Sequence, residues 1–453
     1  MKTLLFCNLI PRKTGAHEAL IAAIGVAFRK AGDEFVVVFS GEPIPPVAES
    51  LCGAGVKWHV MTGWVAPPDS RAPNRGEKVR DWYFILPALR LIRHERPDVV
   101  VVQFGNELPT LAASLLCKIM VWWSRLFPSS TTQQHDNLTT PFPPRWVWAQ
   151  DQRIQDPGRI SRRISKISLL GLGIDRFLAV YEGGRQSMLK RGIPGDKIAV
   201  ILNGIAPYSP IRQKGWLREE LGIDPHEVIF VTNGSLIPRK RIDFLLQVCA
   251  ALRPTEALVD CQVAKLPPAE KVVGCQVADL LGNSPNGQPL TTQQPDNLAT
   301  LLPPWRLLVI GDGPERQGLV ALAGELGVAD RIRFLGLRND VREILAESDI
   351  YLHAARAEAC SYAIIESMAA GIPAVVLNAG AAREQIEDGV SGYVFDEADT
   401  GPFTSRLVAL MSDPSLRMEM GRRAKSRWES SFHVKQAADL YHAMYEDMAT
   451  CRT

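Results

Sequence analysis

The sequence predicts an α/β protein with two domains, each built around a parallel sheet. Strand and helix patterns alternate along the chain, and most of the predicted strands are uninterrupted apolar runs. Strands of that kind are buried on both faces, which is typical of parallel sheets covered by helices. The chain has 453 residues, of which 46% are hydrophobic, so it is too long for a single core. We therefore expect two Rossmann-like domains.

The first domain is expected to span residues 1–206. It opens with an apolar strand at 3–8, a helix at 19–30 and a β-branched strand at 35–40. Further buried strands are predicted at 99–102, 146–149, 176–180 and 198–202. Helical segments separate these strands, as parallel pairing requires.

The second domain is expected to span residues 207–426, after a hinge that we place at 204–212. Asparagine, glycine and proline are concentrated at that hinge, and a second alternating series of strands and helices occupies 228–394. The closing segment, 427–453, contains a helix over 434–448 with one apolar face.

Two insertions interrupt this pattern, at about 128–144 and 254–304. The sequence TTQQHDNL at 131–138 recurs with one change at 291–298, once in each predicted domain. The second insertion has about 50 residues, far more than a connection between a helix and a strand normally needs. We interpret both as exposed, mobile loops, and His135 as an ordinary loop histidine. Because they enter strands, they lie at the sheet edge opposite the one that binds ligands in open α/β folds.

The composition disfavours several classes of protein. A net charge of +2 provides no basic field for a nucleic-acid partner, and the eight cysteines are scattered without the spacing of a metal site. Such thiols are expected in a reducing, cytoplasmic compartment. The apolar stretch at 108–127 is interrupted by Lys118 and Arg125, so no membrane-spanning helix is predicted. Residues 1–10 lack a signal cleavage site and are interpreted as a strand.

The segment EACSYAIIESMAAG, residues 358–371, has the features of an anion site flanked by carboxylates. Ser361 is a good helix N-cap, and Gly371 with the proline that follows ends the helix. Free amides at the helix start would hold a diphosphate, leaving Glu358 in the loop and Glu366 on the second turn as hydroxyl acceptors. This arrangement suits a sugar linked to a nucleotide; the alternative is two ordinary solvated glutamates.

This segment resembles the E-x7-E signature of retaining glycosyltransferases of family 4, which have the two-domain glycosyltransferase B fold. Upstream, residues 233–243 resemble the family element G-R-L-x-x-x-K-G. Lys240 stands at the lysine, Ser235 at the arginine and Arg241 at the second glycine, so Arg239 or Arg241 is expected to supply the second cation.

Further segments match the family in order and spacing. They are 307–314, 332–336 and 348–353, followed by the G-x-x-x-E and D-G-x-x-G patterns at 380–384 and 388–392. The resemblance thus covers most of 228–396. It implies two domains facing across a cleft, with the closing helix crossing back to the first domain. Ala359, Cys360 and Ser361 depart from the usual Gly-Phe-Gly, which bears on the donor sugar.

The resemblance assigns roles to residues of a donor site. Lys240 and Glu358 are expected to be catalytic, with Lys240 on the diphosphate, Glu358 on the sugar hydroxyls and Glu366 on the ribose. The full donor set comprises Gly15, Gly234, Ser235, Arg239, Lys240, Gly311, Glu358, Cys360, Ser361, Tyr362 and Glu366. Gly15 opens a glycine loop after the first strand, and a simple turn is its alternative interpretation.

Acceptor contacts are expected at the carboxyl ends of the first-domain strands. The candidates are His17, Gln103, Asn106, Gln150 and Asp151. Gln150-Asp151 falls where many relatives place a His or His-Asp pair beside the reacting sugar, and here the histidine is absent.

The implied activity is transfer of a hexosyl group from a nucleoside diphosphate sugar to a hydroxyl of a saccharide or lipid-linked saccharide, with retention. The expected setting is polysaccharide or glycoconjugate biosynthesis, without a metal or cofactor. Two alternatives stay open: a catalytically impaired sugar-nucleotide binder, suggested by Ser235 and Gln150, and an epimerase of the same fold. A dinucleotide oxidoreductase is disfavoured because Arg316 stands where the third glycine of G-x-G-x-x-G belongs.

A basic face is predicted inside the first domain. Helical spacing places four cations together, Arg159, Arg162, Arg163 and Lys166, opposite an isoleucine face. This face could attach the protein peripherally to anionic lipid at the inner side of a membrane. An ordinary surface helix is the favoured interpretation, because the segment lies within a domain.

Overall fold

The computed structural model describes residues 1–7, 16–61, 85–103, 115–116, 144–150, 174–252 and 302–450. The two predicted insertions lie almost entirely outside these ranges. So do Gly15, Asn106, Asp151, the four cations of the basic face and the side chain of Gln150. The expectations for these residues therefore stay predictions.

The first sheet has seven parallel strands in the order β3-β2-β1-β4-β5-β6-β7. Their bounds are β1 Lys2–Cys7, β2 Glu34–Phe39, β3 Lys57–Val60, β4 Val99–Gln103, β5 Arg145–Gln150, β6 Arg176–Ala179 and β7 Ile198–Val200. The valines of β4 are fully buried, as expected for a strand covered on both faces. Strand β3 was not predicted, because this edge strand is half exposed and has no continuous apolar run.

Helices cover both faces of this sheet. They are α1 Ala16–Ala31, α2 Pro45–Ala54, α4 Ile85–Glu95 and α7 Glu182–Lys190, with a short 3-10 turn η3 Gly195–Lys197. Helix α1 packs its buried residues Leu20, Ile24 and Phe28 into one core, whereas α4 contributes Ala88 and Ile92 to the core on the other face.

The second sheet has six parallel strands in the order β10-β9-β8-β11-β12-β13. Their bounds are β8 Val228–Asn233, β9 Trp305–Ile310, β10 Ile332–Gly336, β11 Ile350–His353, β12 Ala374–Leu377 and β13 Gly392–Phe395. The helical elements are α8 Trp216–Leu221, η4 Pro238–Lys240, α9 Ile242–Ala251, α12 Arg316–Glu325, η6 Ala329–Arg331, α13 Val341–Ala346, α14 Tyr362–Ala370, α15 Ala382–Gln385, α16 Thr400–Ser412 and α17 Pro414–Ser431. Both sheets thus follow the Rossmann order, in which ligands bind where the strand order reverses. The predicted fold class is confirmed.

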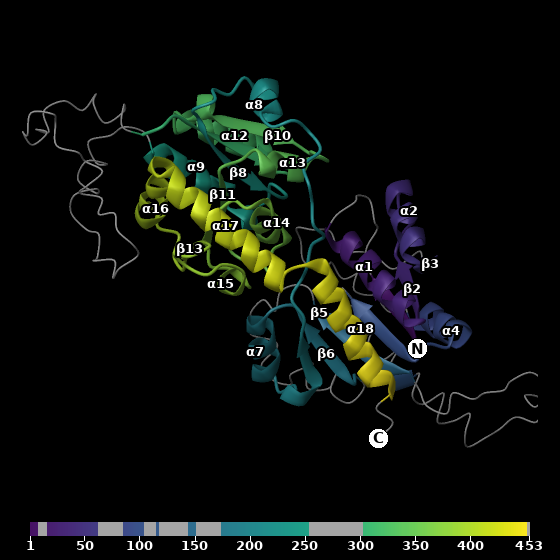
Figure 1. Cartoon of the computed structure of the whole chain (residues 1–453). Coiled ribbons are helices and arrows are strands. Elements are labelled where there is room, and N and C mark those ends of the chain that lie inside the picture. The colour runs from purple at the N-terminus through teal and green to yellow at the C-terminus, as the bar shows by residue number, and fades with distance from the viewer. Residues whose placement is uncertain are drawn as a thin grey trace, which may run out of the picture.

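The chain crosses between the two domains twice, at adjacent places. After β7 it runs through Ile205 to the second domain, and after α17 it returns to α18 (Val434–Thr450), which lies against α1 of the first domain (Figure 1). The two crossings are hydrogen-bonded, with Ile205 N donating to Phe432 O at 3.0 Å and Val434 N to Ile205 O at 2.9 Å. His442 on α18 contacts Asp33 at 2.7 Å. The proposed domain limits at 206 and 426 remain predictions.

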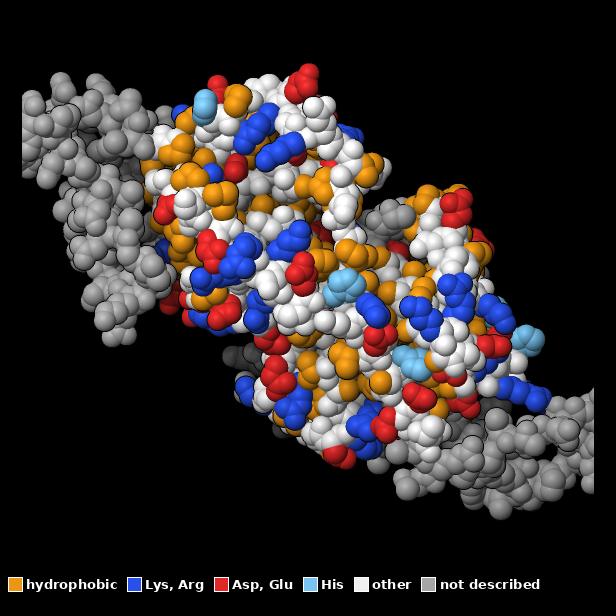
Figure 2. Space-filling model, in the orientation of Figure 1, with side chains coloured by type: hydrophobic (Ala, Val, Ile, Leu, Met, Phe, Trp, Pro, Cys, Tyr) orange, Lys and Arg blue, Asp and Glu red, His pale blue; other side chains and the backbone are white. Residues whose placement is uncertain are grey.

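Charges of both signs are interspersed on the surface. On the face shown in Figure 2, Lys and Arg side chains alternate with Asp and Glu over both lobes. Within the described ranges, no helix is long and apolar enough to span a bilayer, and no group of His, Cys, Asp and Glu has the geometry of a metal site.

Candidate active site

The candidate site lies at the switch point of the second sheet, between β8 and β11. These strands are paired, with Tyr351 opposite Val231, and a loop leaves the carboxyl end of each. The loop after β8 carries Lys240, and the loop after β11 carries Glu358 and leads into α14. The fold therefore brings the two predicted motifs together although they are more than one hundred positions apart.

Two glycines allow the loops after β8 and β9 to touch. Gly234 has φ 142° and Gly311 has φ 131°, values that residues with a Cβ rarely adopt. A Cβ on Gly311 would lie 1.9 Å from the carbonyl oxygen of Gly234, inside any tolerable contact. Gly234 and Gly311 therefore shape the site through their backbones, and Ser235 lies between Gly234 and the buried Leu236.

The predicted catalytic pair is in direct contact. Lys240 Nζ lies 2.5 Å from Oε1 of Glu358, and both side chains are 14% exposed. Arg239 Nη1 lies 3.2 Å from the same oxygen and also donates to Ala357 O at 2.8 Å. Arg239 thus supplies a second cation where Ser235 replaces the expected arginine.

The cations determine the charge of Glu358. Burial raises the pKa of this carboxyl, but opposing contributions from neighbouring side chains, the largest from Lys240, lower it more, so the pKa is below its usual value. Glu358 is therefore ionised at neutral pH, and its oxygens act as hydrogen-bond acceptors.

Arg241 has the backbone conformation for which the family pattern uses glycine. Its φ and ψ are 51° and 47°, in the left-handed region. Its guanidinium lies 5.1 Å from the ring centre of Phe244, and it is Arg239 that contacts the carboxylate of Glu358. Of the two cations predicted to substitute for the missing arginine, the structure therefore brings Arg239 to the site.

Helix α14 spans Tyr362–Ala370 as predicted, and Gly371 ends it with φ 76°. Ser361 is at the N-cap, but the expectation that its side chain caps the helix is wrong, because the hydroxyl makes no capping hydrogen bond. The residue is buried instead, and its carbonyl accepts a hydrogen bond from Gln385 at 2.8 Å. The amides of the first helical turn, beginning at Tyr362, are thus not occupied by a side-chain cap and could face an anion.

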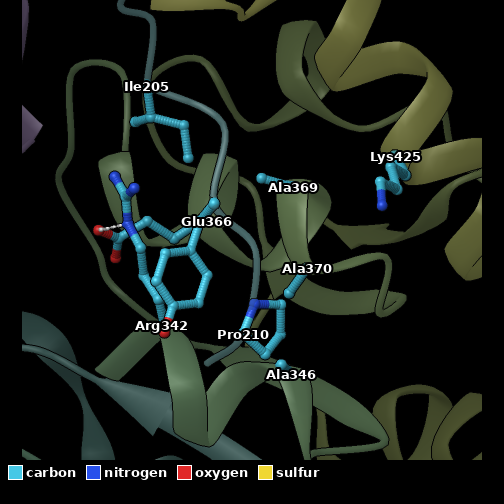
Figure 3. Close-up of a pocket in the computed structure, with 9 residues that line it drawn as sticks. Ile205, Pro210, Arg342, Ala346, Glu366, Ala369, Ala370 and Lys425 are labelled. Carbon is cyan, nitrogen blue, oxygen red and sulfur yellow. Dashed lines mark ion pairs between the residues drawn. The ribbon is translucent and has the colours of Figure 1, made fainter. Parts of the chain in front are cut away.

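Glu366 lies on the second turn of α14, facing a small pocket beside the hinge. Asn233 Nδ2 donates to its Oε2 at 3.3 Å, and Arg342 Nε lies 3.9 Å from its Oε1 (Figure 3). Arg342 also donates to Ala206 O at 3.3 Å, so it joins Glu366 to the hinge. The pocket, of about 60 Å³, is lined by Ile205, Tyr208, Pro210, Arg342, Ala346, Glu366, Ala369, Ala370 and Lys425.

Buried polar side chains connect the two glutamates. Tyr351 Oη donates to Asn233 Oδ1 at 2.9 Å and lies 3.4 Å from His353 Nδ1. His353 Nε2 lies 4.0 Å from Oε1 of Glu358. The sequence analysis did not predict roles for four residues of this network, Asn233, Tyr351, His353 and Arg342. Asn233, Tyr351 and His353 lie within or at the end of apolar strands, where the sequence looks like ordinary hydrophobic core.

The second domain contacts the first domain next to this site. Asn203 Nδ2 donates to Cys360 O at 3.2 Å, which fixes the loop residue that replaces the usual phenylalanine. Glu384, from the predicted G-x-x-x-E pattern, accepts from the amides of Glu182 at 2.8 Å and Gly183 at 3.3 Å, at the start of α7. Gly380 is the glycine of the same pattern. A Cβ at this position would lie 2.2 Å from the backbone carbonyl oxygen of Glu358. This pattern therefore supports the Glu358 loop and joins the domains.

The described acceptor candidates form a separate group on the first sheet. Cys7 ends β1 opposite Gln103, which ends β4 and is buried. His17 Nε2 on α1 lies 3.7 Å from the sulfur of Cys7. His17 and Gln103 are thus placed near the same strand end, whereas Gln150 is described only by its backbone at the end of β5.

Two family models match the chain. The one described as Glycosyltransferase Family 4 matches residues 17–207, and the one described as Glycosyl transferases group 1 matches residues 292–427. Together they cover more than two thirds of the sequence. The chain belongs to glycosyltransferase family 4. The family resemblance inferred from the motifs is confirmed.

Curated relatives of this glycosyltransferase match it over part of their length. N-acetyl-alpha-D-glucosaminyl L-malate synthase of Bacillus anthracis is 32% identical over 143 residues, which are 32% of this chain and 38% of the relative. Lipopolysaccharide core biosynthesis glycosyltransferase LpsE of Rhizobium meliloti is 32% identical over 140 residues, 31% of this chain and 41% of the relative. The matched segment thus spans about two fifths of these relatives.

Solved structures match over the whole chain. HepE of Anabaena, crystallised in complex with UDP, aligns with a TM-score of 0.67 at 15% identity, covering 99% of this chain and 100% of that one. A glycosyltransferase from Rickettsia africae aligns with a TM-score of 0.66 at 14% identity, covering 99% of both chains. At such identities the likeness shows the fold, which is the glycosyltransferase B fold.

Proposed function

We propose that this protein transfers a hexosyl group from a nucleoside diphosphate sugar to a hydroxyl of a saccharide or lipid-linked saccharide, with retention at the anomeric carbon. The observation that carries the proposal is the half-buried cluster of Lys240, Arg239 and Glu358 beside the start of α14, with Glu366 one helical turn further on. Carboxylates and cations in this arrangement match the parts of a sugar nucleotide.

The cations would stabilise the leaving group. As the bond from the anomeric carbon to the diphosphate breaks, negative charge develops on the diphosphate, and Lys240, Arg239 and the amides of α14 oppose it. Lys240 is held by Glu358 at 2.5 Å, so the cation is preorganised before a donor arrives. In this scheme the protein's own cations neutralise the leaving group, and no bound metal is needed.

The carboxylates would bind hydroxyls. Glu358 is ionised and would accept from the sugar, while Glu366 would accept from the ribose. Developing positive charge on the sugar ring is also favoured by the negative charge of Glu358. The contact of Glu384 with α7 keeps the domains together over the site, which would limit hydrolysis of the donor by water.

The relatives support this class of donor and acceptor. HepE structures are described in complex with UDP and with UDP-glucose, and one relative 23% identical over 256 residues, 56% of this chain and 54% of the relative, is a galactosyltransferase of Escherichia coli named for a UDP-Gal donor and a diphosphoundecaprenol-linked acceptor. LpsE is named for lipopolysaccharide core biosynthesis. We propose a related role in polysaccharide or glycoconjugate biosynthesis, at the cytoplasmic side of a membrane.

A thermal-shift panel tests the donor class directly. Sugar nucleotides of uridine, adenosine and guanosine are compared with nicotinamide dinucleotides, because a ligand that binds the native state raises the melting temperature. The sugar nucleotide that binds is then used as donor with a panel of lipid-linked and free saccharides, and the anomeric configuration of the product is read by NMR. Stabilisation by dinucleotides alone, or a product of inverted configuration, would refute the proposal. Binding without transfer to any acceptor would instead indicate a sugar-nucleotide binder.

A further inference from the structure

His353 is a buried histidine in the candidate site, and one of its ring nitrogens has no hydrogen-bond partner among the described residues. Its side chain is 3% exposed, and its Nδ1 lies 3.4 Å from Tyr351 Oη. The other nitrogen, Nε2, has no hydrogen-bond partner among the described residues and lies 4.0 Å from Oε1 of Glu358. A buried polar atom without a partner costs stability, so its position at the donor site suggests a ligand contact.

The charge of Glu366 sets the direction of the hydrogen bonds that lead to this histidine. A carboxylate only accepts, so Asn233 must turn its amide nitrogen toward Glu366, at 3.3 Å. The amide oxygen of Asn233 then faces Tyr351, whose hydroxyl donates to it at 2.9 Å. Reversing the amide would place its oxygen against the carboxylate, which repulsion disfavours.

Tyr351 transmits this direction to His353. Burial raises the pKa of Tyr351 well above its usual value, and Glu366 raises it further, so the phenol keeps its proton. That single proton is donated to Asn233. The phenol oxygen can therefore only accept from His353, and Nδ1 of the histidine must carry a hydrogen.

His353 is then a neutral ring whose free nitrogen is an acceptor. Burial, followed by the nearby charge of Lys240, lowers the pKa of His353 to about 3, so a second proton does not bind at neutral pH. With the hydrogen on Nδ1, Nε2 presents a lone pair next to Oε1 of Glu358. The site thus holds two acceptors side by side.

We propose that His353 Nε2 accepts a hydrogen bond from a hydroxyl of the donor sugar, adjacent to the hydroxyl bound by Glu358. Asn233 and Tyr351 are positioning residues, because they fix the tautomer that makes Nε2 an acceptor. The inference rests on the proposed function. It deepens that function by adding His353 to Glu358 as a second acceptor for hydroxyls of the donor sugar.

The tautomer is measured first, on the full-length protein without ligand. Two-dimensional NMR of the protein labelled with 15N-histidine reports which ring nitrogen carries the hydrogen. The wild type is expected to show Nδ1–H and a bare Nε2 for His353 between about pH 6 and 8. In Tyr351→Phe the acceptor for Nδ1–H is lost, and the ring is expected to switch to Nε2–H, donating toward Glu358. Tyr445→Phe, which removes a buried hydroxyl in the first domain, is the matched control and should leave the signal unchanged.

Binding is measured next, with UDP and UDP-glucose, ADP and ADP-glucose, and GDP and GDP-mannose as paired probes. In His353→Leu the affinity for the sugar nucleotide should fall by about three- to tenfold, the loss expected for one hydrogen bond, while that for the free nucleotide changes less than about twofold. Tyr351→Phe should show the same selective loss. His353→Gln, which can present an acceptor oxygen, should recover part of the lost affinity for the sugar nucleotide. If His353→Leu is unstable, Tyr351→Phe and His353→Gln still test the contact.

The outcomes separate this inference from the proposed function. An Nε2–H tautomer in the wild type, or an unchanged tautomer in Tyr351→Phe, shows that the hydrogen bonds of Asn233 and Tyr351 do not set the tautomer of His353. If the difference in affinity between the sugar nucleotide and the free nucleotide is the same in wild type and His353→Leu, the sugar contact is overturned while the proposed function stays intact. If none of the six probes binds the wild type, the proposed function fails and the sugar contact fails with it.

Discussion

Replacing Lys240 by methionine separates catalysis from folding. The substitution keeps an unbranched apolar stem and removes the ammonium that lies 2.5 Å from Glu358. Breaking a fully buried ion pair costs about 3–5 kcal/mol, but here Arg239 stays at 3.2 Å from the same carboxylate and both members of the pair keep some exposure. We therefore expect a loss of about 1–2 kcal/mol in the free energy of unfolding.

The effect on turnover should be larger. Removing one group that stabilises the developing charge of a leaving group costs about 10²–10³ in kcat. Turnover is measured as sugar transfer at saturating donor, and stability by urea denaturation of the same preparations. Because the diphosphate contact is strongest in the transition state, kcat is expected to fall more than donor affinity.

Lys2→Met is the matched control. Lys2 Nζ lies 2.6 Å from Glu95, and these side chains are 24% and 12% exposed, similar to the Lys240 pair, but they lie at the amino end of the first sheet. This variant should lose a comparable amount of stability and keep turnover within about twofold of wild type. Transfer by Lys240→Met at a rate near that of wild type, or equal losses of turnover in both variants, would refute the role given to Lys240.

Three further predictions concern the same domain. Arg241→Gly should raise the free energy of unfolding by up to about 1 kcal/mol in urea titrations, because glycine adopts φ 51° without the penalty that a Cβ imposes; an unfolding midpoint below that of wild type would contradict this. Gly311→Ala should lower the free energy of unfolding by at least about 2 kcal/mol and abolish donor binding, because its Cβ would meet the Gly234 carbonyl oxygen at 1.9 Å. The control Gly318→Ala in α12 has open space around its Cβ and should be neutral or stabilising. Equal effects of the two substitutions would disprove the close approach of Gly311 to Gly234. The pKa of Glu358 is lowered in the folded state, so its ion pairs stabilise the fold above the unfolded-state pKa, and this stabilisation is lost as pH falls through the folded-state pKa. Below about pH 4, the free energy of unfolding of the wild type should therefore decline more steeply with falling pH than that of Glu358→Gln. Parallel pH dependences of the two proteins would rule this out.

Features set by local chemistry were predictable from the sequence. Helix α14 spans Tyr362–Ala370 as predicted, because these residues are acceptable helix formers and Gly371 adopts the left-handed conformation that ends a helix. The apolar runs likewise predicted strands such as β4 and β8, because a strand buried on both faces has apolar residues at successive positions of its own sequence. Lys240 and Glu358 were identified from motifs, and their contact confirms that these motifs meet in space.

Features set by strand pairing were not predictable. Tyr351 and His353 look like members of an apolar strand, and Asn233 looks like the polar end of another. Their hydrogen bonds exist because β11 lies beside β8 in the sheet, which no local pattern records. The surroundings of Ser361 were likewise not predictable, because this residue is buried and its carbonyl accepts from Gln385, a contact that no local pattern records.

The paired crossings between the domains limit how the enzyme can open. Ile205 is hydrogen-bonded to both Phe432 and Val434, and a Cβ on Gly204 would lie 2.8 Å from the Cα of Val434, so the two chain segments cannot slide past each other. Such a two-stranded pivot permits bending but resists twisting. Any opening about this pivot would also have to break the hydrogen bonds that Glu384 accepts from the amides of Glu182 and Gly183 at the start of α7.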